Sequence, residues 1–185
     1  MKFEPRKIIR LQNYDYSTNG AYFITICVEN GHEILGQIVG DGALDVPCKN
    51  DDFSSVHYVK LTNIGEIVKR HIENTDNAYD GEIKLDKYVI MPNHIHILIM
   101  LNNAESANSG TSRAPSPTNQ KIPQIISTLK TLITKELGYS IWQRSFHDHI
   151  IRNEEAYKKI WNYIDTNPQN WGKDKYYNKN NYIKQ

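Results

Sequence analysis

Two strand-like segments separated by a Pro-Asn pair constrain the fold of this chain more than any other feature. Residues 83–101 are IKLDKYVIMPNHIHILIML, in which two segments with many β-branched and other apolar residues flank Pro92 and Asn93. Proline has no amide hydrogen for a β-ladder, and a Pro-Asn pair favours a turn. The sequence therefore predicts two strands, at 83–90 and 94–101, joined by a tight connection as a β-hairpin.

The rest of the chain supplies the elements that complete a sheet and its helices. Strand-like segments occur at 21–28, 32–39 and 141–151, and helical periodicity occurs at 63–74, 122–138 and 153–167. The first two strands are expected to form a hairpin. Without one strand of that hairpin, the order is βαββαβ. We therefore predict an α+β fold of the ferredoxin-like or RRM-like type: an antiparallel sheet with helices mainly on one face, an extra N-terminal hairpin strand and a C-terminal helix.

Two of the helices carry signals at their ends. Gly138 is expected to stop the helix at 122–138. Asn153 is the expected N-cap of the last helix, where early glutamates suit the helix dipole, and Pro168 is expected to end it.

The length and composition favour one domain. The chain has 185 residues, which suits a single domain, predicted at 1–170. Polar stretches at 40–55 and 102–120 are predicted loops, and the second is expected to be flexible. Residues 171–185 form a predicted basic, tyrosine-rich tail. The net charge of +1 neither indicates nor excludes a polyanionic partner.

The cysteines and the apolar runs bear on location. Cys27 and Cys48 are the only cysteines, and no CxxC or CxxH spacing occurs, which argues against a zinc finger. Such sparse cysteines suit a reducing cytoplasm, so a cytoplasmic protein is expected. No apolar run approaches about 20 residues, and no signal peptide is recognisable, so no membrane span is predicted.

His94 and His96 stand out within the second strand of the predicted hairpin. Side chains alternate along a strand, so both imidazoles lie on one face, while Ile95, Ile97 and Ile99 face the helices. Two adjacent imidazoles on an exposed sheet face form a bidentate site for a metal ion, which needs a third ligand from elsewhere. The alternative is two ordinary histidines, because a short HxH pattern arises often by chance.

The last helix offers partners for these histidines. Lys159, Tyr163 and Asn167 are spaced four apart and share one helical face. The apolar stripe is predicted elsewhere, at Tyr157, Ile160, Trp161 and Ile164. A phenol as nucleophile, an amide oxygen in a metal shell and a cation beside a phosphate suit phosphoryl transfer. This is the expected catalytic helix, although an edge-of-core tyrosine remains the alternative for Tyr163.

Several motifs together resemble a known family. LDKYVIMPNHIHILIML and WQRSFHDHIIRNEEAYKKIWNYIDTNP resemble the single-tyrosine HUH transposases of the IS200-like superfamily, in which HUH denotes His-hydrophobic-His. The REP-associated tyrosine transposases are the most similar branch. YDYSTNGAYFITICVENG and LTNIGEIVKRHIEN fit the same family, and the resemblance covers most of residues 10–170.

The resemblance implies a function and a set of roles. His94 and His96 would bind a divalent metal, Tyr163 would be the nucleophile, and Asn167 would be the third ligand. The implied substrate is single-stranded DNA with a foldback hairpin or palindromic repeat, cut through a 5′-phosphotyrosyl intermediate and then rejoined. Phosphate oxygens favour Mg²⁺ or Mn²⁺, and the two imidazoles favour Mn²⁺, or Zn²⁺ in vitro.

DNA binding requires cations near such a site. The cations that flank it in the sequence, and that we expect to contact DNA, are Lys130, Arg144, Arg152 and Lys159. A second HxH, His147 and His149, is either a rival metal site or, more simply, part of a strand. The tail can follow phosphates and stack bases, or can be merely solvated.

Three alternatives remain open at this stage. The chain could be a non-catalytic, single-strand-binding module, although Tyr163 and Asn167 would then have no role. A replication initiator of the same superfamily fits less well, because no phosphate loop is recognisable. A domesticated transposase acting on chromosomal repeats cannot be told from a mobile one, and both monomer and homodimer are compatible with the resemblance.

Overall fold

The computed structural model describes residues 11, 14–40, 57–79, 81–102 and 120–177. The predicted loop at 40–55 and the predicted flexible loop at 102–120 lie almost entirely outside the described residues. The last part of the predicted tail, residues 178–185, also lies outside them.

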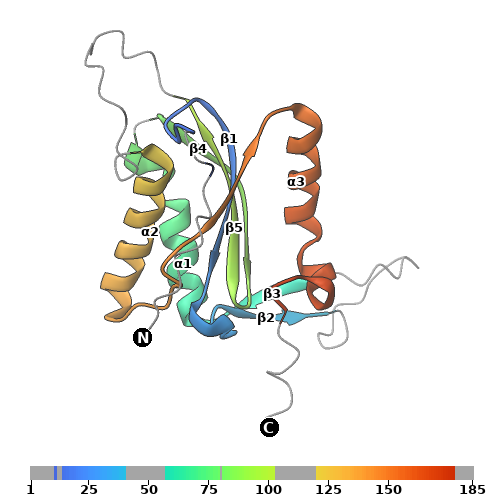
Figure 1. Ribbon diagram of the computed structural model, residues 1–185. Helices are drawn as coiled ribbons and strands as arrows, with labels where there is room; N and C mark the ends of the chain where they lie inside the picture. Colours follow the sequence, from blue (N-terminus) through green and yellow to red (C-terminus); the bar gives the residue numbers. More distant parts are fainter. Residues whose placement is uncertain (1–10, 12–13, 41–56, 80, 103–119, 178–185) are drawn as a thin grey trace, which may run out of the picture.

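A four-stranded antiparallel sheet forms the centre of the molecule (Figure 1). Its order is β4-β5-β1-β6, with bounds Ile83–Met91, His94–Leu101, Gly20–Cys27 and His147–Ile151, respectively. β4 and β5 pair from Ile83–Leu101 to Met91–His94, on either side of Pro92 and Asn93, with one register shift between Leu85 and Lys87. The hairpin predicted at residues 83–101 is therefore confirmed, and it supplies half of the sheet.

The helices lie on both faces of this sheet. α1 (Asn63–Glu73) and α2 (Lys121–Leu137) cover one face, and α3 (Glu154–Thr166) lies against the other (Figure 1). The elements β1-α1-β4-β5-α2-β6 follow the βαββαβ order, and the strand order is the one that this plan requires. The predicted α+β class is confirmed, with α3 added on the face opposite the other two helices.

The alternation predicted for β5 is also confirmed. Ile95, Ile97 and Ile99 are buried in the larger core, which includes apolar residues of α1 and α2. On the other face of the sheet, Leu98 packs with Ile164 of α3 in a smaller core. Each face of β5 is thus covered by apolar packing.

No described helix is long and apolar enough to cross a membrane.

The predicted hairpin of the first two strands is wrong. β2 (Gly36–Val39) pairs with β3 (Tyr58–Leu61), a strand that we did not predict, in a separate two-stranded sheet. The physical reason is that β1 has no free side, because β5 occupies one edge and β6 the other. The chain leaves β1 through a short 3₁₀ turn, η1 (Glu29–Gly31), in which Gly31 has a φ of 67°.

The predicted strand at 141–151 is too long, since β6 begins only at His147. Residues 141–146 form a loop that makes a single bridge to the end of β1, between Trp142 and Val28. Lys130 Nζ donates hydrogen bonds to the carbonyls of Gln143 and Ser145, at 2.9 and 2.7 Å. The apolar pattern of this segment reflects burial of its rings and not a β-ladder.

The predicted helix ends are close to those observed. Gly138 caps α2 in the left-handed conformation, and the Asn153 side chain accepts a hydrogen bond from the Ala156 amide. α3 ends at Thr166, before Pro168, but the chain continues in a helical conformation. Asn167 keeps helical angles, and η3 (Pro168–Lys173) continues from it as a 3₁₀ helix. A further 3₁₀ turn, η2 (Asp76–Tyr79), precedes β4.

Candidate metal and tyrosine site

His94 and His96 lie at the start of β5, on the face that α3 covers. Their exposed fractions are 0% and 1%, so the expectation that this face is exposed is wrong. The rings of Trp171 and Tyr176 lie 5.9 and 4.6 Å from the His94 ring, between centroids. The chain that follows α3 thus folds back over the histidines, which sequence periodicity does not reveal.

The hydrogen bonds around the histidines orient both rings. The Nδ1 atom of His94 lies 2.8 Å from the Asn93 amide oxygen, which can only accept, so this nitrogen carries the hydrogen. The Asn93 amide nitrogen donates to the carbonyls of Gly31 and Tyr176, which fixes the orientation of that amide. His96 Nδ1 bonds the Thr25 hydroxyl at 2.8 Å. The Nε2 atom of each ring is left to face the other.

The two Nε2 atoms lie 3.1 Å apart. Lone pairs at this separation require a shared proton or a cation between them. Burial lowers the pKa of His94 to about 3, with a further contribution from the charge of Lys175. Burial, followed by the proximity of His94, lowers the pKa of His96 well below its usual value. Both imidazoles are therefore neutral near pH 7, which is the form that binds metals.

Asp174 brings a carboxylate to the histidine pair. One of its oxygens and one nitrogen from each histidine lie within 4.8 Å of one another, the only such three-residue group in the described part of the chain. Asp174 Oδ1 accepts a hydrogen bond from the Tyr176 backbone N–H at 2.7 Å. Asp174 was missed from the sequence because it stands between two lysines in the predicted tail, with no spacing that links it to the histidines.

Tyr163 reaches the same point from α3. Its hydroxyl lies 3.3 Å from His96 Nε2 and donates to Asp174 Oδ2 at 3.1 Å. The residue is 38% exposed, so it is neither a core side chain nor fully solvated. Burial, and next the charge of Asp174, raise the pKa of Tyr163 to about 12. The phenol is thus protonated at neutral pH, with a carboxylate placed to accept its hydrogen.

Asn167 lies one helical turn beyond Tyr163 and is 2% exposed. Its amide nitrogen donates to Asp174 Oδ2 at 3.2 Å. Its buried amide oxygen has no hydrogen-bond partner among the described residues. A buried acceptor without a partner is costly and points to a missing donor or cation. Its role as third ligand stays a prediction.

These groups suit a divalent metal ion. The donors are two neutral imidazoles, the Asp174 carboxylate and the unpartnered Asn167 oxygen. Nitrogen and oxygen donors in this ratio are typical of sites for first-row divalent ions, including Mn²⁺. The hydrogen bonds from Asn93 and Thr25 correspond to the outer-shell contacts that orient metal-bound histidines.

The predicted DNA-binding cations do not gather at this site. Lys159 pairs with Glu155 at 2.6 Å on the exposed side of α3. Lys130 and Arg144 line a groove beside α2, on the opposite face of the sheet, and Arg152 lines a separate hollow with His149. Within the described residues, no hydrogen bond or ion pair joins Arg144, Arg152 or Lys159 to Tyr163 or the histidine pair.

The structure also places two other features that the sequence singled out. His147 and His149 share the sheet face of His96, because they lie opposite Thr25 and Phe23 in β1, but they join no three-residue metal cluster in the described part of the chain. Of the predicted apolar stripe, Trp161 is 37% exposed, with Lys87 Nζ 4.1 Å from its ring centre. The other members of the stripe do pack: Ile164 is buried in the smaller core, and Tyr157 and Ile160 are partly buried against it.

Comparison with known proteins places this geometry in context. No family model matches the chain. An uncharacterized protein of Haemophilus influenzae is 31% identical over 184 residues, which covers 93% of each chain. A solved structure of a REP-associated tyrosine transposase, bound to a REP hairpin, aligns with 90% of this chain and 76% of its own, with a TM-score of 0.56 and 20% identity.

Proposed function

We propose that this chain cleaves and rejoins single-stranded DNA through Tyr163. The chain belongs to one family with the Haemophilus influenzae protein. It has the fold of the REP-associated tyrosine transposase. The observation that carries the proposal is the 3.3 Å approach of the Tyr163 hydroxyl to His96 Nε2, beside a second imidazole and a carboxylate. A tyrosine placed only for packing has no need of these three neighbours.

The proposed substrate is a single strand beside a DNA hairpin. The structural neighbour was solved with a REP hairpin, and the expectation from the sequence is the same class of DNA. Sequence specificity would come from base contacts that the described side chains do not specify.

The proposed reaction exchanges one phosphoester for another. The Tyr163 oxygen attacks phosphorus, a Tyr–O–P bond forms, and the P–O3′ bond breaks. Asp174 accepts the phenol proton, for which its Oδ2 is already the hydrogen-bond acceptor. The departing 3′-oxygen takes a proton from solvent. Attack by a 3′-hydroxyl on the phosphotyrosine reverses these steps, so the phosphoester energy is kept and no nucleotide is consumed.

A divalent ion, Mg²⁺ or Mn²⁺, would neutralise charge on the scissile phosphate and make phosphorus more electrophilic. His94, His96 and Asp174 would hold it, and Asn167 could add its unpartnered oxygen. The pKa of about 12 makes Tyr163 a weak nucleophile by itself. A proton acceptor in contact with the hydroxyl and a neutralised phosphate are the two forms of help that the residues offer.

A covalent-adduct experiment tests the proposal. The protein is incubated with end-labelled hairpin DNA carrying single-stranded arms, with Mn²⁺, and run on a denaturing gel. We expect a shifted protein–DNA band that is lost in Tyr163→Phe, in His94→Ala/His96→Ala and with EDTA. Tyr157→Phe is the matched control on the same helix, and it should keep the band. An adduct that persists in Tyr163→Phe would refute the assignment.

A further inference from the structure

A groove on the face opposite Tyr163 has a composition that the proposed reaction does not explain. It lies between α2 and residues 140–146 and has a volume of about 640 Å³. Lys130, Lys135 and Arg144 line it, together with hydroxyl and amide side chains, and no aspartate or glutamate is among its lining residues. In a chain with 22 basic and 21 acidic residues, such a segregation of charge is a local feature and not a consequence of composition.

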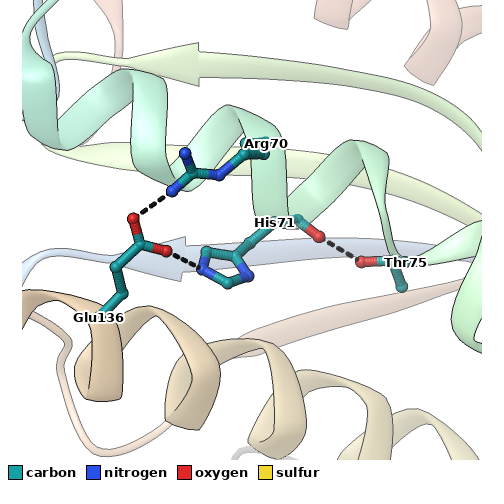
Figure 2. A network of polar contacts seen from close by, with 4 residues as sticks. All are labelled: Arg70, His71, Thr75 and Glu136. Atoms are coloured by element: carbon teal, nitrogen blue, oxygen red, sulfur yellow. Dashed lines mark hydrogen bonds and ion pairs between the residues drawn. The ribbon is translucent and has the colours of Figure 1, made fainter.

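The single carboxylate of α2 is held away from this groove. Glu136 is adjacent in sequence to Lys135, yet its oxygens pair with Arg70 and His71 of α1 (Figure 2). The acid is therefore neutralised at the α1–α2 contact. Lys135 and Arg144 are exposed, and both line the groove. The charge that remains at the groove is positive.

The aromatic residues of the groove indicate which form of nucleic acid fits it. Trp142 and Phe146 are each 6% exposed, so neither offers a face on which an unpaired base can stack. Single-strand binding sites typically use exposed aromatic rings on which bases stack, whereas duplex backbones are bound by cations and polar side chains. Trp142 also has an indole N–H that is buried with no acceptor among the described residues.

The groove is connected to the histidine pair through its wall. Gln143 lines the groove, and its backbone N–H donates to the Cys27 carbonyl at 2.9 Å. Cys27 lies opposite His94 in the β1–β5 register. A duplex held in the groove would thus lie near the end of β1, the strand that pairs with the start of β5. It would lie on the face of the sheet opposite the histidines.

From these observations we infer that the groove between α2 and residues 140–146 binds the phosphate backbone of duplex DNA, the stem of the hairpin next to the cut. The inference deepens the proposed function and rests on it for the identity of the DNA. Lys135 and Arg144 are the residues that contact phosphate. Lys130, which is bonded to the carbonyls of Gln143 and Ser145, holds the groove wall and adds its charge.

The test measures binding without catalysis. Fluorescence anisotropy in EDTA, on the Tyr163→Phe background, compares a labelled DNA hairpin with unpaired oligothymidine of equal length. Lys135→Ala/Arg144→Ala should weaken hairpin binding about tenfold at moderate salt and leave oligothymidine binding unchanged. The slope of log affinity against log salt should shrink by about two, one for each lost phosphate contact. Lys135→Glu/Arg144→Glu should weaken hairpin binding further.

The matched control is Lys84→Ala, which removes an exposed cation from β4, at the other edge of the sheet, and should change neither affinity. Unchanged hairpin affinity and salt slope in the double variant would overturn the inference. Equal weakening of hairpin and oligothymidine would also overturn it, in favour of a single-strand path. Because binding is scored without cleavage, a missing adduct with hairpin-selective binding would refute the proposed reaction and leave the groove assignment standing.

Discussion

At the scale of single residues, the pairing of His94 with His96 followed from strand alternation, and the helical spacing placed Tyr163 and Asn167 together. The burial of the pair did not follow, because it depends on residues 171–177, which resemble a tail in the sequence. Asp174 was missed for the same reason. Its contacts with Tyr163 and Asn167 exist only because η3 reverses the chain after α3.

Asp174→Asn tests which oxygen donor matters most. Loss of the carboxylate should weaken Mn²⁺ binding by roughly 10- to 100-fold, as measured by isothermal titration calorimetry. It should also lower the pKa of Tyr163 below about 12, because the charge of Asp174 is the second cause of that elevation. Asp165→Asn, at an exposed position paired with Lys87, is the control. Wild-type affinity in Asp174→Asn, with affinity lost in Asn167→Ala, would make Asn167 the ligand and contradict this account.

The buried His94 makes stability depend on pH. The pKa of His94 is about 3 in the folded state, below the usual 6.5. As the pH falls, the unfolded chain therefore binds more protons at this residue than the folded protein does. The contribution of the neutral His94 to the free energy of unfolding is fully present above pH 6.5, and it is lost as the pH falls towards 3. Between about pH 7 and about pH 5, the contribution of His94 to the free energy of unfolding should fall by about 2 kcal/mol.

Urea unfolding of the metal-free protein at several pH values measures this loss. In His94→Gln, the fall in the free energy of unfolding should be smaller than in the wild type by that amount, because no buried imidazole remains at this position to take up a proton. An identical pH dependence in the two proteins would show that His94 is not buried as described.

At the scale of elements, the periodic segments were predictable and their partners were not. The β4–β5 hairpin and the three helices follow from apolar spacing, capping residues and a central Pro-Asn break. The partner of β2 could not be deduced, because β3 is only four residues long and the occupation of both edges of β1 is a property of the whole sheet. Residues 141–146 were assigned to a strand because buried rings mimic alternation.

Gly65 in α1 gives a prediction opposite to that of helix propensity. Replacing glycine with alanine inside a helix usually stabilises by up to about 1 kcal/mol. Here an added Cβ would lie 2.0 Å from the Leu35 carbonyl oxygen. We therefore expect Gly65→Ala to destabilise the protein by on the order of 2 kcal/mol. Gly172→Ala, where nothing lies within 4 Å of an added Cβ, is the control, and chemical denaturation compares the two. A more stable Gly65→Ala protein would contradict the packing of α1 on this carbonyl.

At the scale of the whole molecule, the two faces of the sheet differ in what packs against them. One carries α1, α2 and the larger core. The other carries α3, with the histidines beneath Trp171 and Tyr176. The ferredoxin-like plan and the added C-terminal helix were predictable from element order. The return of the chain over the histidine pair was not, since it rests on tertiary contacts such as the bond from Asn93 to the Tyr176 carbonyl.

This covering makes a prediction about access. Tyr176→Ala removes a ring that lies 4.6 Å from the His94 ring, between centroids, so diethylpyrocarbonate should modify His94 and His96 severalfold faster in the metal-free variant than in the wild type. Tyr139→Ala, at a position that is 55% exposed, is the control with the same loss of a ring. Mass spectrometry of the modified peptides gives the rates. Equal rates in all three proteins would mean that Tyr176 does not shield the histidines.

The central claim is that Tyr163, of the 12 tyrosines in the chain, becomes linked to DNA. The structure supplies a rival, because the Tyr176 ring lies 4.6 Å from the His94 ring, between centroids. Peptide mapping of the trapped adduct after nuclease digestion tests the claim most directly. The account predicts a nucleotide on the peptide that contains Tyr163, with none in His94→Ala/His96→Ala. A nucleotide on Tyr176, or on any other tyrosine, would contradict it.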